Sequence, residues 1–456
     1  MLHCRELCTN AMTEPPKGWM DAMRSRTLPL AALMLGTVGP VSADGAELSD
    51  VAAEAIFEEA QMLCQADNGQ LWGASLCGPM MLVDRSSRRV TASHADAQGN
   101  LQARGKVFVG QLPPDAIIAN TAVDWSGTRW TQLLWPLPQD EGRRRTLLAH
   151  EMFHRLQPAL AIAAPAEGGN EHLDTLEGRY WLQLEWRALA AALSATGPGA
   201  QRNAMNDALA FRAERYRRSP AAAQEEAALE LNEGLAEYTG VLVGNPTPSA
   251  RIEATLHDLR AHAGDRSFVR SFAYATGPAY GLLLDQVSPG WHRDLGLHAR
   301  DLGTLLAGHT RISPSTDESA LRTAAARHGG PALHSREVQR EQQRLALLER
   351  NRARFVTGPV LRLDLRNMRI QFDPSNMQPL PGNGTVYPTM QLSDVWGTLT
   401  VTDGALMQND WKAVFVQAPA SGDLPLQGSG WRLSLEPGWT LVPGARRGDY
   451  MLLAPP

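Results

Sequence analysis

Hydrophobic and polar residues alternate with different periods along the chain, and the period predicts where helices and strands lie. Apolar residues recur at helical spacing in four segments, 44–63, 175–195, 202–218 and 221–243, which predicts helices there. Between residues 70 and 137, segments rich in β-branched and aromatic residues are separated by turn signals such as "AQGN" and "DWSGT". They predict three to five strands, mostly antiparallel. From residue 355 onward the pattern again alternates between two faces.

These patterns predict an α+β protein with a β-rich N-terminal part packed on a mainly helical domain, followed by an all-β domain. A chain of 456 residues suits two or three domains. We place a helix and sheet at 44–142, a helical domain at 143–354, and a small β-sandwich or barrel at 355–456, after an extension and signal peptide at 1–43. The charged helix at 335–355 is expected to connect two of these domains.

Composition narrows the classes of protein. A hydrophobic fraction of 43% and a charged fraction of 20% are ordinary for a soluble globular protein. The formal net charge is −5, and no basic patch dominates. We therefore expect no nucleic-acid partner.

The N-terminal region predicts export to the periplasm or secretion. From Met23 the chain has two arginines, a short apolar run and small residues before Asp44, which is the layout of a signal peptide cleaved after Ala43. We expect Met23 rather than Met1 to be the true start, and no stable membrane span after cleavage; the alternative is an uncleaved anchor. Two cysteines then remain, Cys64 and Cys77, and an even count in an exported protein predicts one disulfide.

The clearest chemical motif is "HEMFH", which places His150, Glu151 and His154 in the order H-E-x-x-H. Residues four apart lie on one face of a helix, so both histidines can bind one metal ion. Glu151 falls where a carboxylate can reach a metal-activated water without being a ligand. The alternative is a chance polar patch on an amphipathic helix.

A zinc site of this kind needs a third protein ligand. A third histidine is excluded, because Gln157 and Leu160 stand at the positions that H-E-x-x-H-x-x-G-x-x-H requires. The segment "NEGLAEY" offers Glu233 and Glu237 instead, and the helical stretch expected at 222–242 places them one turn apart on one face. One could bind the metal while the other holds a ligand histidine. The alternative is a solvated acidic face.

The two motifs together resemble the gluzincin zinc metallopeptidases, in which a glutamate of an N-E-G-x-A or similar motif completes the site. The resemblance implies a thermolysin-like helical catalytic domain with one Zn²⁺ held by His150, His154 and Glu233. It also implies that Glu151 is the general base and that Glu237 supports a ligand histidine. The 78 residues between His154 and Glu233 exceed the short link of the common aminopeptidases.

A tyrosine is the expected oxyanion donor. "Tyr274-Ala-Thr-Gly277" resembles the Y-x-K-G segment of zinc aminopeptidases of this clan, with Thr276 in place of lysine. We favour Tyr274, with Tyr280 as the alternative proton donor. Both could equally be core tyrosines with hydrogen-bonded hydroxyls.

The sequence thus predicts an exported zinc-dependent peptidase that acts on peptides or proteins. Two other classes remain open, a zinc-binding or assembly protein without catalysis and a zinc hydrolase that is not a peptidase. The G-x-M-E-N segment with which related aminopeptidases capture a free amine is absent, so an endopeptidase or a carboxypeptidase remains open.

Overall fold

The computed structural model describes residues 48–160, 162, 168–295, 301–373 and 376–455. Two compact units divide the chain: Met1–Ile162 with Thr239–Pro246 form the first, and Ala163–Tyr238 with Thr247–Pro456 form the second. The expected boundary at 142/143 falls inside the first unit, because the helix that begins there packs on the N-terminal sheet. The expected signal peptide lies outside the described residues.

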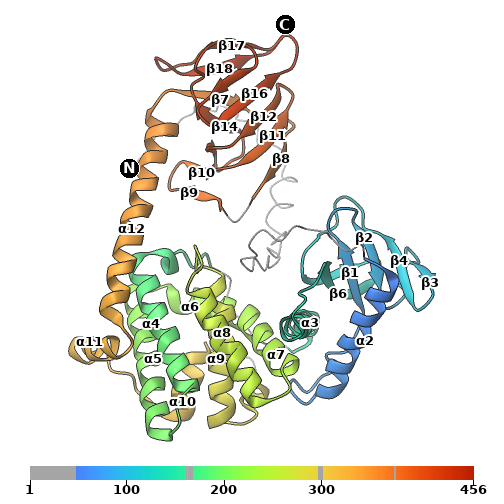
Figure 1. Ribbon diagram of the computed structural model, residues 1–456, viewed down its shortest axis with the longest axis vertical. Coiled ribbons are helices and arrows are strands. Elements are labelled where there is room, and N and C mark those ends of the chain that lie inside the picture. Colours follow the sequence, from blue (N-terminus) through green and yellow to red (C-terminus); the bar gives the residue numbers. More distant parts are fainter. Residues whose placement is uncertain (1–47, 161, 163–167, 296–300, 374–375, 456) are drawn as a thin grey trace, which may run out of the picture. The chain divides into compact units, whose positions relative to one another are not determined.

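The first unit is a sheet with two helices (Figure 1). Its elements are α2 (Asp50–Asp67), β1 (Met80–Asp84), β2 (Arg89–Ala92), β3 (Gln102–Arg104), β4 (Val107–Gln111), β5 (Thr121–Trp125), β6 (Thr128–Trp135), α3 (Glu141–Leu156) and the 3-10 turn η1 (Gln157–Leu160). The strand order is β3-β4-β2-β1-β6-β5.

This sheet is mostly antiparallel, as expected, but it has more strands than the three to five that the turn signals indicated. Six strands form it, and β1 runs parallel to β6. The pairing of β1 with β6 joins segments about 50 residues apart, which a local pattern cannot reveal. Helix α2 packs against β2 and β4 and beside α3, which packs against β5 and β6. β5 is therefore an edge strand that lies against α3.

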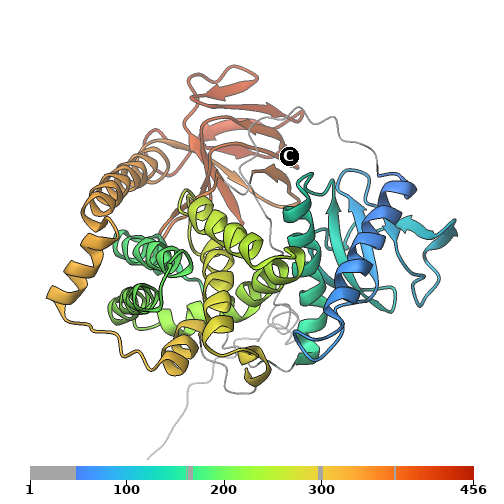
Figure 2. The ribbon, with the colours of Figure 1, turned by 60° about the horizontal axis from the view of Figure 1, so that its bottom comes forward.

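The second unit has a helical part, coloured from green to orange in Figure 2. Its elements are η2 (Glu171–Asp174), α4 (Leu176–Leu193), α5 (Pro198–Arg218), α6 (Ala222–Leu229), the π-helical turn η3 (Glu230–Gly234), α7 (Leu235–Gly244), α8 (Pro248–His262), α9 (Ser271–Val287), η4 (Trp291–Asp294), α10 (Leu302–Thr310), α11 (Glu318–Arg327), α12 (Gly330–Arg352) and η5 (Ala353–Thr357). The residues of α7 from Thr239 onward belong to the first unit.

The C-terminal strands form two sheets around one apolar core. They are β7 (Val360–Asp364), β8 (Arg369–Phe372), β9 (Gln378–Leu380), β10 (Gly384–Tyr387), β11 (Met390–Asp394), β12 (Gly397–Val401), β13 (Ala405–Met407), β14 (Ala413–Gln417), β15 (Leu426–Gly428), β16 (Trp431–Leu435), β17 (Thr440–Pro443) and β18 (Tyr450–Leu453). The orders are β17-β18-β7-β14-β13-β10-β9 and β15-β16-β12-β11-β8. Leu363 and Val414 of one sheet share a core with Leu399 and Leu433 of the other, which is a β-sandwich.

Two further expectations concern the disulfide and the membrane. Cys64 and Cys77 form a disulfide with 5.1 Å between their Cα atoms. Within the described ranges, no helix combines the length and the apolar character that crossing a bilayer requires.

Candidate metal site

Helix α3 presents His150 and His154 one turn apart. Asp140 caps the helix by accepting the backbone N–H of Arg143 at 2.9 Å, and the neighbouring arginines bind Glu59 of α2. Leu148 and Phe153 are fully buried, so the apolar face of α3 is fixed against the first unit. The direction in which the two histidines point therefore follows from the packing of the helix.

The two imidazoles are arranged as a pair of metal ligands would be. The Nε2 atoms of His150 and His154 lie 3.0 Å apart, and two nitrogens on a tetrahedral zinc ion would be about 3.3 Å apart at the usual Zn–N distance. His154 Nδ1 lies 3.1 Å from Gln157 Oε1. Because an amide oxygen only accepts, this contact makes Nδ1 the donor and leaves the Nε2 lone pair of a neutral ring for a metal.

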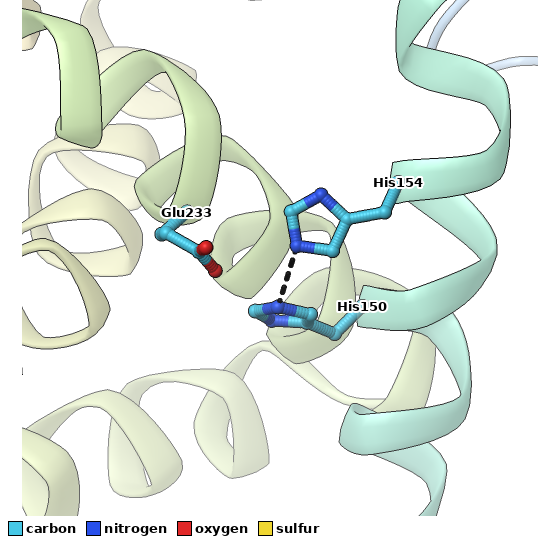
Figure 3. Close-up of side chains that lie close together, drawn as sticks. All are labelled: His150, His154 and Glu233. Atoms are coloured by element: carbon cyan, nitrogen blue, oxygen red, sulfur yellow. Dashed lines mark hydrogen bonds between the residues drawn. The ribbon is translucent and has the colours of Figure 1, made fainter. Parts of the chain in front are cut away.

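Glu233 completes a group of three possible ligands. One carboxylate oxygen of Glu233 and one ring nitrogen each of His150 and His154 all lie within 4.8 Å of one another. Figure 3 shows the carboxylate directed toward the two rings. Two nitrogens and one carboxylate oxygen are a ligand set that zinc accepts in catalytic sites.

Helix α7, which follows Glu233, approaches α3 closely. A Cβ atom at Gly240 would lie 2.6 Å from the carbonyl oxygen of Thr146, and one at Gly244 would lie 2.6 Å from the Thr146 nitrogen. Only glycine allows this approach. Asn245 Nδ2 also donates to Thr146 Oγ1 at 3.2 Å. Thr146 is one turn before His150, so these contacts fix the part of α7 that belongs to the first unit, from Thr239 onward, against the helix that carries the histidines.

The expected helical stretch at 222–242 is helical throughout, but a π-helical turn (η3) at Glu230–Gly234 separates α6 from α7. Two contacts hold this turn. Arg212 donates to both carboxylate oxygens of Glu230, at 2.7 and 3.1 Å, and a Cβ atom at Gly277 would lie 2.2 Å from the carbonyl oxygen of Gly234. π-helical turns are frequent at functional sites, and this one carries Glu233.

Arg212 also binds other helices of the second unit. It donates to Glu185 at 2.7 Å and to Asp301 at 2.8 Å, and its side chain is 4% exposed. Burial disfavours the charge of Arg212, but Glu185 and Glu230 outweigh that effect and hold the pKa of Arg212 well above its usual value. The arginine therefore stays charged and keeps Glu230 in place.

Tyr274 and Arg270, at the start of α9, bind the carboxylate of Glu233. Tyr274 Oη donates to Oε2 at 2.6 Å, and Arg270 Nη2 lies 3.3 Å from Oε1. Glu233 is 4% exposed and Tyr274 is 7% exposed. The structure thus brings the favoured tyrosine to the third possible ligand of the group.

Tyr280, the alternative proton donor, lies elsewhere. Its hydroxyl donates to Glu185 Oε1 at 2.7 Å, and the residue is fully buried. It belongs to the ion-pair network around Arg212, whose guanidinium lies 4.3 Å from the centre of the Tyr280 ring. This placement suits a core tyrosine.

The two remaining acids are buried. Glu151 is 1% exposed and Glu237 is 5% exposed. Glu151 follows His150 on α3, and Glu237 lies in the first turn of α7. Their roles as general base and as support for a ligand histidine stay predictions.

Three residues near the group were missing from the site expected from the sequence. Gln157 lies three residues after His154, a spacing that predicts contact on a helix. Arg270 precedes Tyr274 by four residues, but its contact with Glu233 spans 37 residues. His262 lies 6.3 Å from Tyr274 between ring centres and binds Asp265 through Nδ1 at 2.8 Å, and only the i, i+3 pairing with Asp265 could have been read locally.

Comparison with known proteins does not assign the chain to a family. No family model, curated protein or solved structure matches the chain.

Proposed function

We propose that the protein is an exported zinc-dependent peptidase with a thermolysin-like arrangement of its catalytic residues. The observation that carries the proposal is the convergence of His150, His154 and Glu233 within 4.8 Å, with Glu151 buried next to the first histidine. A purely structural zinc site favours four protein ligands, whereas three leave a position open for water or substrate.

The roles follow from the positions. Zn²⁺ would supply Lewis acidity, which polarises the peptide carbonyl and lowers the pKa of a water. Glu151 takes the proton of the attacking water and passes it to the leaving amine. The hydroxyl of Tyr274 donates its single proton to Glu233, and it would have to turn from that carboxylate to stabilise the developing oxyanion. The free edge of β5, which lies against α3, suits an extended peptide that pairs through its main chain.

The compartment is part of the proposal. A disulfide such as Cys64–Cys77 persists in oxidising surroundings and is rare in the cytosol. It supports export.

Glu151→Gln tests the proposal directly. The variant should bind one zinc ion with wild-type affinity, measured by metal analysis and chelator competition, and should lose hydrolysis of a mixed peptide library because the base is gone. Glu349→Gln, an exposed change on α12, is the matched control. Peptidase activity that survives in Glu151→Gln or in excess chelator would contradict the proposal. Zinc binding without hydrolysis in the wild type would indicate a binding protein, and chelator-sensitive cleavage of esters alone would indicate another hydrolase.

A further inference from the structure

Arg270 is a positively charged residue that contacts Glu233. The proposed hydrolysis assigns it no role. Its side chain is 37% exposed and pairs with Glu233, whose side chain is 6% exposed. The residue precedes the first turn of α9 and lies four residues before Tyr274. A partly exposed arginine beside a buried metal-ligand candidate can contact both the site and a bound molecule.

The Arg270 contact is the weaker of the two that Glu233 receives from this segment. The Arg270 distance of 3.3 Å exceeds the roughly 2.7–2.9 Å of a strong charge-assisted hydrogen bond, whereas the Tyr274 distance is 2.6 Å. A metal ion that binds Glu233 would compete for the same negative charge. Arg270 cannot lose its proton, so it would keep its positive charge while Glu233 is shared with the metal.

The positive charge of Arg270, whose side chain is 37% exposed, determines which group of a bound molecule it can contact. A substrate ammonium group would be repelled, while a carboxylate would be attracted and would match the planar guanidinium with two parallel hydrogen bonds. We propose that Arg270 binds a carboxylate of the substrate next to the bond that is hydrolysed. This inference rests on the proposed peptidase function and deepens it by naming the substrate class.

The distances place that carboxylate close to the bond. A metal ligated by Glu233 would lie about 2 Å from the carboxylate, which puts the guanidinium of Arg270 within roughly 5–6 Å of the reacting centre. In a peptide, the carboxyl carbon of the residue that follows the bond lies about 3–3.7 Å from the reacting carbonyl carbon. The carboxylate is therefore the C-terminal group of a single residue to be released, or the acidic side chain of that residue.

Three peptides of one sequence separate these sources. The first ends in a free carboxylate one neutral residue after the bond, the second is its C-terminal amide, and the third is an amide with glutamate at that residue. Losing a hydrogen bond to a charged group costs about 10- to 100-fold. We expect kcat/KM for the second peptide to be lower by this factor than for the first, the third, or both, and the favoured peptide identifies the source.

Substitution of Arg270 should remove this difference. Arg270→Gln should reduce the favoured peptide to the value of the neutral amide, mainly through KM, and Arg270→Lys should give an intermediate value because it keeps the charge but not the fork. Arg266→Gln changes an exposed arginine four residues before Arg270; it is the matched control and should change nothing.

Binding provides a readout that does not depend on turnover. The Kd of each peptide is measured by calorimetry on zinc-loaded Glu151→Gln, with and without Arg270→Gln. Equal Kd values for acid and amide, or equal kcat/KM values unchanged by Arg270→Gln, would overturn the role of Arg270 while leaving a peptidase. Absence of hydrolysis in the wild type would overturn the proposed function, and the Kd values would still decide the role of Arg270.

Discussion

Gly277→Ala perturbs the contact between α9 and the π-helical turn. The added Cβ atom would lie 2.2 Å from the carbonyl oxygen of Gly234 and 2.4 Å from its Cα atom. Both are backbone atoms, so no side-chain rotation relieves the clash. Since non-bonded heavy atoms prefer about 3.5 Å, α9 has to move away from η3 by about 1 Å or more.

This displacement also breaks a bond of the candidate site. Tyr274 lies one turn before Gly277, and its hydroxyl is 2.6 Å from Glu233, so the same movement takes that distance to about 3.6 Å, outside hydrogen-bond range. Overpacking costs about 1–3 kcal/mol, and losing a bond to a buried carboxylate costs about 1.5–3 kcal/mol. Alanine favours the helix over glycine by about 1 kcal/mol, which offsets part of this cost. We expect a net loss of about 3 kcal/mol.

Two assays check this expectation. Urea unfolding followed by circular dichroism should show the loss of stability, and chelator competition should show zinc affinity lower by about 10- to 100-fold, as for outer partners of metal ligands. Gly308→Ala is the control, because a Cβ atom there, inside α10, meets nothing within 4 Å, and it should stabilise by about 0.5–1 kcal/mol. If Gly277→Ala behaves like Gly308→Ala and binds zinc normally, the glycine contact does not position Tyr274 and Glu233.

Two predictions concern pH. Burial raises the pKa of Asp96, but hydrogen bonds from Ser126 and from backbone N–H groups lower it overall from 3.8 to about 2. The ionised Asp96 therefore adds about 2 kcal/mol to the free energy of unfolding above pH 4, and this contribution is lost as the pH falls toward 2. In urea unfolding, Asp96→Asn should destabilise the protein by about that amount at pH 7 and by clearly less at pH 3, and an equal loss at both pH values would contradict this. Burial lowers the pKa of His262, but Asp265 and, more weakly, Asp258 and Glu237 raise it above 6.5 overall. The ion pair of His262 with Asp265 therefore stabilises the fold fully below pH 6.5, and this stabilisation is lost as the pH rises through the pKa of the folded protein. His262→Gln should lower the free energy of unfolding more at pH 6 than at pH 9, and the reverse order would refute the assignment.

Local periodicity predicted those elements whose pattern depends on neighbouring residues. The segment 175–195 became α4 (Leu176–Leu193), and "WRLSL" became β16 with alternating buried and exposed positions. In β16 the apolar positions and the buried positions coincide, whereas in α4 burial also includes polar side chains such as Arg179 and Glu185. The spacing of the H-E-x-x-H motif likewise predicted that both histidines share a face of α3, and their Nε2 atoms lie 3.0 Å apart.

Local periodicity could not predict contacts between residues that are distant in the sequence. The contact between Gly234 and Gly277 and that between Arg270 and Glu233 each join different helices. No local pattern distinguishes a glycine that allows backbone contact from one in open space, such as Gly308. The sequence therefore indicated which residue types could form the site, while the packing of α9 determined which of them contact Glu233.

The π-helical turn shows why the direction of Glu233 could not be derived from helical spacing. In a continuous α-helix each residue turns by about 100°, so Glu230 and Glu233, three residues apart, would point to nearly the same side. The structure needs them to differ, because Glu230 binds the buried Arg212 while Glu233 is directed toward His150 and His154. A π-turn has more residues per turn than an α-helix, so each residue turns by less and the angle between the two carboxylates widens. One acid can then anchor the turn from within the helical core while the other remains available as a metal ligand.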